Sequence, residues 1–140
     1  MQSGFLERAG AKLHYTVSGR NHAPALVLLH PLGASAAVFE SQRAEFERSF
    51  RVIALDMAGH GASVLHQGAP RSRSLADLAD DALAVLDALG IQRAHWCGVS
   101  IGGMIAQGLA VKRLDLVRAM VLSNTGAKIG TVEMWDQRIA

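Results

Sequence analysis

The sequence predicts one α/β domain with a mostly parallel sheet that follows an amino-terminal hairpin. Short apolar runs alternate with longer helix-like stretches along the chain, which is the pattern of parallel strands joined by helical crossovers. One run, residues 25–29, is apolar at every position, as in a strand that is covered on both faces. The 140 residues, of which 50% are hydrophobic, suffice for one domain core.

The first half of the chain is expected to contain a hairpin, a strand, a helix and a second strand. In residues 5–17, Gly10 supplies the turn, and apolar residues after it alternate with polar ones, as in a half-buried strand. The buried strand at 25–29 follows. A helix over 36–50 and a short strand at 52–55 complete this half.

The second half begins with a long helix from Ser74, a good N-cap, to Gly90, a helix stop. The next strand is expected at 95–97, a helix after Gly102, and a further strand at 117–122. A sheet that ends after about four parallel strands leaves its last strand with an unpaired edge. We therefore expect the chain to be the amino-terminal portion of a larger protein.

Composition narrows the possible partners. The formal net charge is +2 without a basic block, so no nucleic-acid surface is expected. No basic segment precedes an apolar run at the start, and no stretch reaches the ~18 apolar residues of a membrane span. The one cysteine, Cys97, lies in a strand-like run and favours a reducing, cytoplasmic location. The sequence leaves the oligomeric state open.

The most informative motif is Gly-x-Ser-x-Gly at Gly98, Ser100 and Gly102. It lies where a strand-like run passes into a helix-like one, which is the context of a serine nucleophile on a sharp turn. The backbone N–H of Ile101, the residue after the serine, is then a candidate oxyanion donor, paired with that of Leu32 in a Pro-Leu-Gly turn. The motif predicts a serine hydrolase.

Two alternatives to this interpretation stay open. The first is a chance Gly/Ser turn. The second is a nucleotide-binding turn, but Ser100 replaces the glycine of G-x-G-x-x-G that approaches the pyrophosphate, and no Gly-Lys-Ser/Thr occurs. The late place of the serine turn in the strand order also argues against a nucleotide site. Loops at 30–33, 56–63 and 98–102 should share one rim of the sheet.

A base for Ser100 is missing from the sequence, because no histidine follows it and a serine hydroxyl needs an imidazole to take its proton. His30, at a strand end, is expected to anchor its loop by hydrogen bonds, and His60 to pack within its own loop. His14 is expected at a solvated or strand-surface position. None of the histidines has the spacing of a metal pair, and no cofactor is expected.

No acid in the chain is expected to be the acid of a catalytic triad. Asp56 follows a strand and could steady its own loop by accepting backbone N–H groups. The aspartates of the long helix are expected on its wet face. These are Asp77, Asp80, Asp81 and Asp87.

Taken together, these residues resemble the α/β-hydrolases, and more narrowly the 3-oxoadipate enol-lactone hydrolases. The general resemblance rests on His30-Pro-Leu-Gly, on the loop from Asp56 to Ser63 and on the serine motif. The narrower one rests on Leu86-Asp-Ala-Leu-Gly-Ile91, on His95-Trp-Cys-Gly-Val-Ser-Ile-Gly-Gly-Met104 and on Asn124-Thr-Gly-Ala-Lys-Ile-Gly-Thr131 with Trp135 and Arg138-Ile-Ala140. Relatives commonly carry an arginine where this chain has Met57-Ala58.

The resemblance implies an α/β-hydrolase fold, with residues 1–124 as part of the core and 125–140 as the start of a lid. It implies Ser100 as nucleophile, a triad acid and histidine beyond residue 140, and a small enol-lactone bearing a carboxylate as substrate. Lys128 and Arg138 are candidate cations for that carboxylate and Trp135 an apolar wall, with a solvated lid face as the open alternative.

Other functions remain open within and outside the enzymes. A cofactor-independent haloperoxidase, an esterase or a carbon–carbon bond hydrolase would share the serine turn and differ mainly in the lid. A truncated, non-catalytic fold partner is the alternative outside enzymes. The end of the open reading frame distinguishes these classes: a stop codon at 141 favours the fold partner, and continuation into an Asp and a late His favours the hydrolase. On its own, the 140-residue chain is expected to be inactive as a lactonase.

Overall fold

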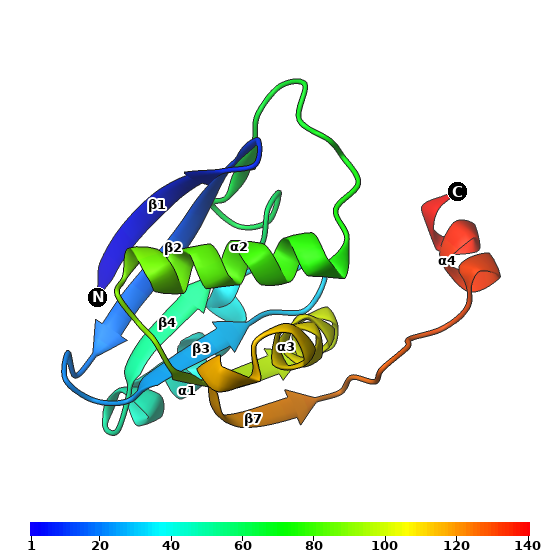
Figure 1. Cartoon of the computed structure of the whole chain (residues 1–140). Helices are drawn as coiled ribbons and strands as arrows, with labels where there is room; N and C mark the ends of the chain where they lie inside the picture. The colour runs from blue at the N-terminus through cyan, green and yellow to red at the C-terminus, as the bar shows by residue number, and fades with distance from the viewer.

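The structure is a computed structural model that describes residues 1–140, and the α/β fold class is confirmed (Figure 1). One sheet contains every strand. The strands are β1 (Gln2–Arg8), β2 (Ala11–Gly19), β3 (Ala25–Leu29), β4 (Arg51–Leu55), β5 (Val64–Leu65), β6 (Ala94–Val99) and β7 (Val117–Ser123). The helices are η1 (Ala36–Phe39), α1 (Glu40–Glu47), α2 (Leu75–Ala88), α3 (Ile101–Lys112), η2 (Leu114–Leu116) and α4 (Val132–Ile139).

The sheet has the order β1-β2-β4-β3-β6-β7, with β5 paired to β2. Strands β4, β3, β6 and β7 are parallel, while β1 and β2 form the expected hairpin and β2 runs antiparallel to β4. The prediction of about four parallel strands is therefore confirmed. Strand β7 pairs only with β6, so its outer edge is unpaired.

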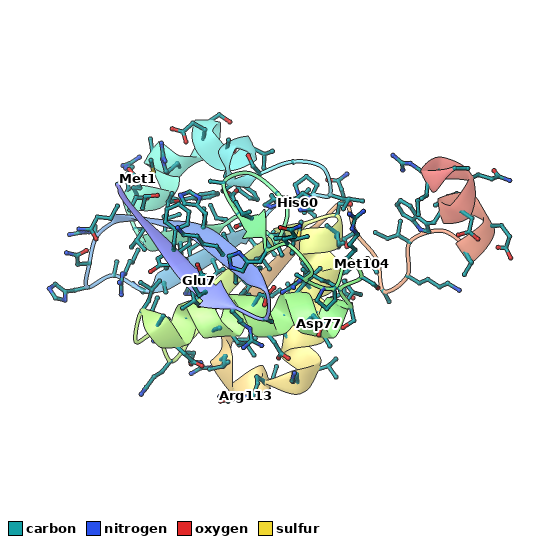
Figure 2. The ribbon with its side chains drawn as sticks, turned by 90° about the horizontal axis from the view of Figure 1, so that it is seen from above. Met1, Glu7, His60, Asp77, Met104 and Arg113 are labelled. Atoms are coloured by element: carbon teal, nitrogen blue, oxygen red, sulfur yellow. The ribbon has the colours of Figure 1, made fainter.

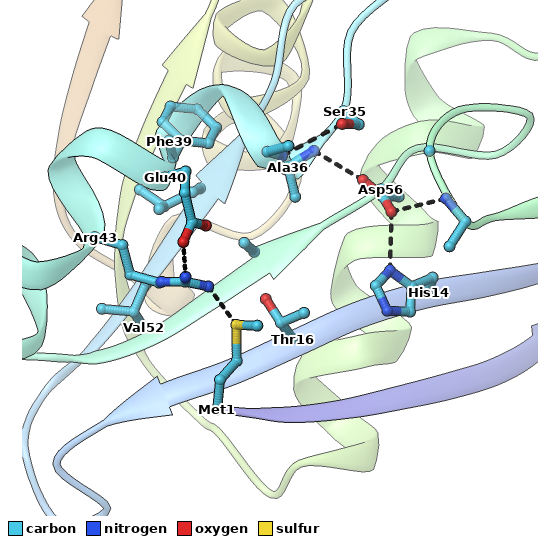
Figure 3. Close-up of a pocket in the computed structure, with 15 residues that line it drawn as sticks. Met1, His14, Thr16, Ser35, Ala36, Phe39, Glu40, Arg43, Val52 and Asp56 are labelled. Carbon is cyan, nitrogen blue, oxygen red and sulfur yellow. Dashed lines mark hydrogen bonds and ion pairs between the residues drawn. The ribbon is translucent and has the colours of Figure 1, made fainter.

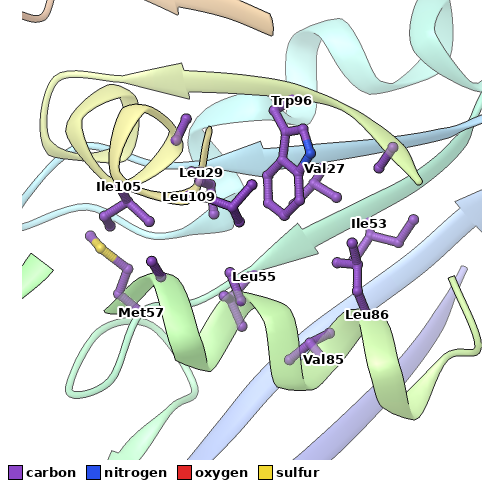
Figure 4. Packing of buried hydrophobic residues seen from close by; sticks show 14 of the residues in the cluster. Val27, Leu29, Ile53, Leu55, Met57, Val85, Leu86, Trp96, Ile105 and Leu109 are labelled. Atoms are coloured by element: carbon purple, nitrogen blue, oxygen red, sulfur yellow. The ribbon is translucent and has the colours of Figure 1, made fainter. Parts of the chain in front are cut away.

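Helices cover both faces of the sheet. On one face, α2 and α3 pack over Val27, Leu29 and Trp96 in the larger core cluster (Figure 4). On the other, Phe39 of η1 packs against Leu28 and other β3 and β4 residues. Alternate residues of one strand thus serve opposite cores, which explains why residues 25–29 are apolar throughout.

Local capping decides where two helices begin. At α2, Ser74 accepts the N–H of Asp77 and the Asp77 carboxylate accepts the N–H of Ser74, a reciprocal capping box. The helix expected over 36–50 is instead a short 3₁₀ turn followed by α1. There the Ser35 hydroxyl accepts the N–H of Ala37. This cap favours a tight 3₁₀ turn before the α-helix begins.

The expectation of a wet face for all four aspartates of α2 is wrong for Asp81, whose side chain is 3% exposed. Its carboxylate accepts hydrogen bonds from Arg8 at 3.1 Å and from Arg73 at 2.6 Å. The β1–β2 turn and the loop before α2 pack over this part of the helix. Helical periodicity cannot reveal such a cover, because the covering segments come from elsewhere in the chain.

From Thr125 the chain leaves the sheet as an extended segment and ends in α4, which stands away from the body (Figures 1 and 2). None of the residues of α4 is buried. No helix is both long and apolar enough to cross a membrane.

Candidate active site

Ser100 lies between the end of β6 and the start of α3 in a strained backbone conformation. Its φ is 56° and its ψ is −117°, a combination that side-chain-bearing residues rarely adopt. The side chain is half-buried. A non-glycine residue held in this way on a strand-to-helix turn is the arrangement that the Gly-x-Ser-x-Gly motif predicts.

Close backbone approach explains the two glycines of the motif. A Cβ atom on Gly98 would lie 2.3 Å from the carbonyl oxygen of Gly102, and one on Gly102 would lie 2.2 Å from that of Leu29. Real Cβ atoms do not approach that closely. Any other residue at either position would therefore push α3 away from β3 and β6.

The end of β7 and the loop that follows it hold the serine turn in place. The N–H of Ser100 donates to the carbonyl of Ser123 at 3.0 Å. The Thr125 hydroxyl donates to the carbonyl of Ser100 at 2.6 Å, and Gly103 packs against the Thr125 side chain. The strain at Ser100 is thus compensated by bonds from a neighbouring strand.

The two candidate oxyanion donors lie on loops that adjoin the same turn. In the sheet, Leu29 pairs with Gly98, so the loop that contains Leu32 leaves β3 beside the serine turn. The N–H of Leu32 donates to no group of the chain, and its side chain is 57% exposed. The N–H of Ile101, the first residue of α3, has no partner within the helix.

His30 anchors its loop, as expected. Its ring is fully buried: Nδ1 bonds to the carbonyl of Pro31 at 2.7 Å, and Nε2 accepts the N–H of Met57 at 3.0 Å. Burial lowers the pKa of His30, outweighing the opposite effect of the Pro31 carbonyl. Both ring nitrogens are occupied, so His30 is not free to serve as the base for Ser100.

His60 packs within its loop, as expected, bonding to the carbonyl of Ala58 at 3.1 Å with its ring 5.3 Å from that of His30. Met57 and Ala58 are buried in the larger core cluster. That loop is therefore held here by apolar packing and the His30 contact.

Asp56 steadies its loop and two further segments. Its carboxylate accepts the N–H of Ala36 at 2.8 Å, that of Ala62 at 3.0 Å and Nδ1 of His14 at 2.8 Å. Burial alone would raise the pKa of Asp56, but these three donors outweigh it and lower that pKa. A Cβ on Gly61 would lie 2.4 Å from the carboxylate, so the loop needs glycine there.

Of the two positions expected for His14, solvated or strand-surface, the solvated one is wrong: the residue lies on β2, and its side chain is only 15% exposed and bonds to Asp56. The sequence contains no signal for this pair, because the two residues lie 42 positions apart.

Three candidate substrate-binding residues lie in the segment that leaves the body. The Trp135 indole N–H donates to the carbonyl of Ile129 at 2.7 Å, and the Arg138 guanidinium lies 5.2 Å from the Trp135 ring. Lys128 is exposed. Because α4 stands away from the sheet (Figure 2), the structure does not bring these side chains to Ser100.

Comparisons with known proteins agree with this geometry. A family model described as alpha/beta hydrolase fold matches residues 24–138. The chain is 34% identical to 3-oxoadipate enol-lactonase 1 of Acinetobacter baylyi, over 94% of this chain and 48% of the relative. It is similar to the crystal structure of a hydrolase from Pseudomonas aeruginosa PA01, with a TM-score of 0.92, 38% identity and coverage of 98% of this chain and 51% of the other.

A second solved structure, the enol-lactonase from Burkholderia xenovorans LB400, gives a TM-score of 0.89 and 36% identity. It covers 96% of this chain and 52% of the other. The chain thus spans about half the length of the relatives that it matches.

Proposed function

The chain belongs to the α/β-hydrolase family, and on that premise we propose that the whole protein is a serine hydrolase of a small enol-lactone that bears a carboxylate. The observation that carries the proposal is the strained turn at Ser100, with φ of 56° between β6 and α3. Further support comes from the relatives named enol-lactonase.

In the proposed mechanism, the hydroxyl oxygen of Ser100 attacks the lactone carbonyl while a histidine from the rest of the protein takes its proton. The carbonyl oxygen becomes an oxyanion that accepts hydrogen bonds from the N–H groups of Leu32 and Ile101. The ring C–O bond breaks and the histidine returns the proton to the enol oxygen, which stays attached to the acyl chain; the enol then becomes a ketone. Water then cleaves the acyl-enzyme, which frees 3-oxoadipate and Ser100.

Residues 125–140 are proposed to begin a lid over this site. Lys128 and Arg138 would then pair with the free carboxylate of the substrate, and Trp135 would form an apolar wall. For this role residues 125–140 must move toward Ser100, since α4 stands away from the sheet. If replacement of both cations by Met leaves the KM for the lactone unchanged in the complete protein, the lid residues do not bind the carboxylate.

The deciding experiment compares the protein encoded by the complete open reading frame with its Ser100→Ala variant on 3-oxoadipate enol-lactone. We expect loss of at least about 10⁴-fold in kcat, while Ser49→Ala, an exposed serine on another surface, retains full activity. A wild-type protein that cleaves simple esters but not the lactone would contradict the proposal that the substrate is the enol-lactone. An active Ser100→Ala variant would contradict the nucleophile.

The 140-residue chain alone is proposed to lack lactonase activity, because it contains no histidine after Ser100. Its Ser100 should react with a fluorophosphonate far more slowly than the serine of a complete hydrolase. Stoichiometric labelling of the peptide that contains Ser100 at a rate like that of a complete hydrolase would overturn this statement.

A further inference from the structure

A second serine of the chain is hydrogen-bonded to a histidine that is itself bonded to a buried aspartate. The Ser3 hydroxyl lies 2.5 Å from Nε2 of His14, and Nδ1 of the same ring lies 2.8 Å from the Asp56 carboxylate. Ser3 is on β1, His14 on β2 and Asp56 directly after β4. This array is separate from Ser100, which lies at the end of β6.

The hydrogen bond to Asp56 decides which nitrogen of the His14 ring donates a proton. An ionised carboxylate only accepts hydrogen bonds, and the bonds to Asp56 hold its pKa below the usual value. Nδ1 of His14 is therefore the donor to Asp56, and in the neutral ring Nε2 carries the lone pair, which faces the Ser3 hydroxyl. A nucleophile, a base and an acid that orients the base are the elements of an activated serine.

Several contacts hold the His14 backbone and ring in place. The backbone N–H of Asp56 donates to the carbonyl of His14 at 3.0 Å. The N–H of His14 donates to the Ser63 hydroxyl at 2.7 Å, and that hydroxyl donates to the carbonyl of Asp56. The Phe5 ring lies 5.1 Å from the imidazole. Only Nε2 of the ring remains available for chemistry, and it points to Ser3.

A cavity of about 260 Å³ adjoins the array on the α1 side of the sheet (Figure 3). Its wall contains His14 and Asp56 together with apolar side chains such as Leu28 and Phe39. Ser3 is not itself in the wall, but it pairs with Thr16 of β2, which lines the cavity. Residues opposite each other on neighbouring strands point to the same face, so Ser3 lies beside the cavity, which is large enough for a small acyl group.

We propose that Ser3 is a second nucleophile, which takes the acyl group from small activated esters with an apolar acyl chain. The Ser3 oxygen attacks the ester carbonyl and its proton passes to Nε2 of His14. The ester C–O bond breaks, and the alcohol or phenol leaves with that proton. The product is an acyl ester of Ser3, which water hydrolyses to the carboxylic acid.

Turnover at this site should be slow. Arg43 contributes a guanidinium to the cavity wall, but it pairs with Glu40 and Glu47, so it offers little charge to an oxyanion. Loss of a single oxyanion donor costs ~10²–10³ in rate in complete hydrolases. A burst of acylation followed by slow release is therefore the expected time course.

The test uses the 140-residue chain with Ser100→Ala, so that its result does not depend on the function proposed above. The chain is mixed with p-nitrophenyl acetate at pH 8, p-nitrophenolate release is followed, and the acetylated residue is located by peptide mass spectrometry. We expect acetyl on Ser3. Adding His14→Gln should slow the burst about 10²-fold, within the usual contribution of a general base, and adding Ser3→Ala should abolish it, because the acylated oxygen is then absent. Ser49→Ala should leave it unchanged.

Acetyl on the terminal amine, on Cys97 or on His14 without acetyl on Ser3 would overturn the proposal. So would equal bursts from the Ser3→Ala and Ser49→Ala variants. Both positions are exposed, so neither substitution should disturb the fold. Equal thermal midpoints would verify this, and they keep the comparison decisive even if His14→Gln unfolds.

Discussion

A Cβ atom on Gly102 would lie 2.2 Å from the carbonyl oxygen of Leu29, so α3 begins in direct backbone contact with the end of β3. This contact places the serine turn against the loop that contains Leu32. The two parts of the proposed oxyanion site are thus joined by sterics before any side chain takes part. Substitutions that separate these backbones should affect both stability and activity.

Gly102→Ala should therefore destabilise the chain by about 1–3 kcal/mol, the usual cost of overpacking. Gly108 is the matched control, because it lies in the same helix and a Cβ there meets nothing within 4 Å. Gly108→Ala should stabilise by up to ~1 kcal/mol through helix propensity. Urea unfolding of both variants measures the difference, and equal midpoints would refute the steric argument.

His30 should make stability depend on pH. Its folded pKa is lowered by burial, so the unfolded chain binds the proton first as pH falls. The stabilisation is complete above the unfolded pKa of about 6.5 and is lost as pH falls toward the lowered folded pKa, by at most ~1.4 kcal/mol per pH unit for one group. Unfolding curves between pH 7.5 and 5 should show this slope in the wild type and not in His30→Gln.

Asp81 and Asp80 are neighbours on α2 with opposite environments. Asp81→Ala leaves two arginines without their shared carboxylate, and should cost about 3 kcal/mol, near the lower limit for a buried pair because Arg8 is 36% exposed. Asp80 pairs only with Lys112 near solvent, so Asp80→Ala should cost under ~1 kcal/mol. Thermal unfolding of the two variants checks this, and similar losses would contradict it.

Leu32 should act through its backbone rather than its side chain. In the complete protein, Leu32→Pro removes the N–H that is proposed to stabilise the oxyanion, and kcat should fall ~10²–10³-fold. Leu32→Ala keeps the N–H and should change kcat little, since the side chain is 57% exposed. Steady-state kinetics of both variants on the lactone distinguish the two roles. A large loss of kcat in Leu32→Ala would show that the side chain, and not the N–H, supports catalysis.

Most of the fold could be predicted from the sequence because its signals are local. The continuous apolar run at 25–29 and the cap at Ser74 locate a strand and a helix by themselves, and both are confirmed. Strand β5 was beyond prediction, since two residues carry no periodicity. The helix expected over 36–50 differs at its start, where the Ser35 cap favours a 3₁₀ turn.

The candidate site likewise contains residues whose positions the sequence predicts and residues whose positions it does not. Gly98, Ser100 and Gly102 lie within five positions of one another, and sterics over so short a span already require the strained turn. The anchoring of the Leu32 loop by His30 follows from its place at a strand end. The positions of Lys128, Trp135 and Arg138 relative to Ser100 depend on how the segment after Thr125 packs, for which the residues themselves provide no local signal.

By itself, the sequence determined the parallel sheet and the serine turn, because apolar runs and closely spaced glycines act on the backbone nearby. Only the tertiary structure decided that Asp81 is buried under Arg8, 73 positions away, and that His14 meets Asp56. Each of these pairs joins segments that approach only when the sheet is assembled. Their burial and charge are properties of that assembly, which no local pattern encodes.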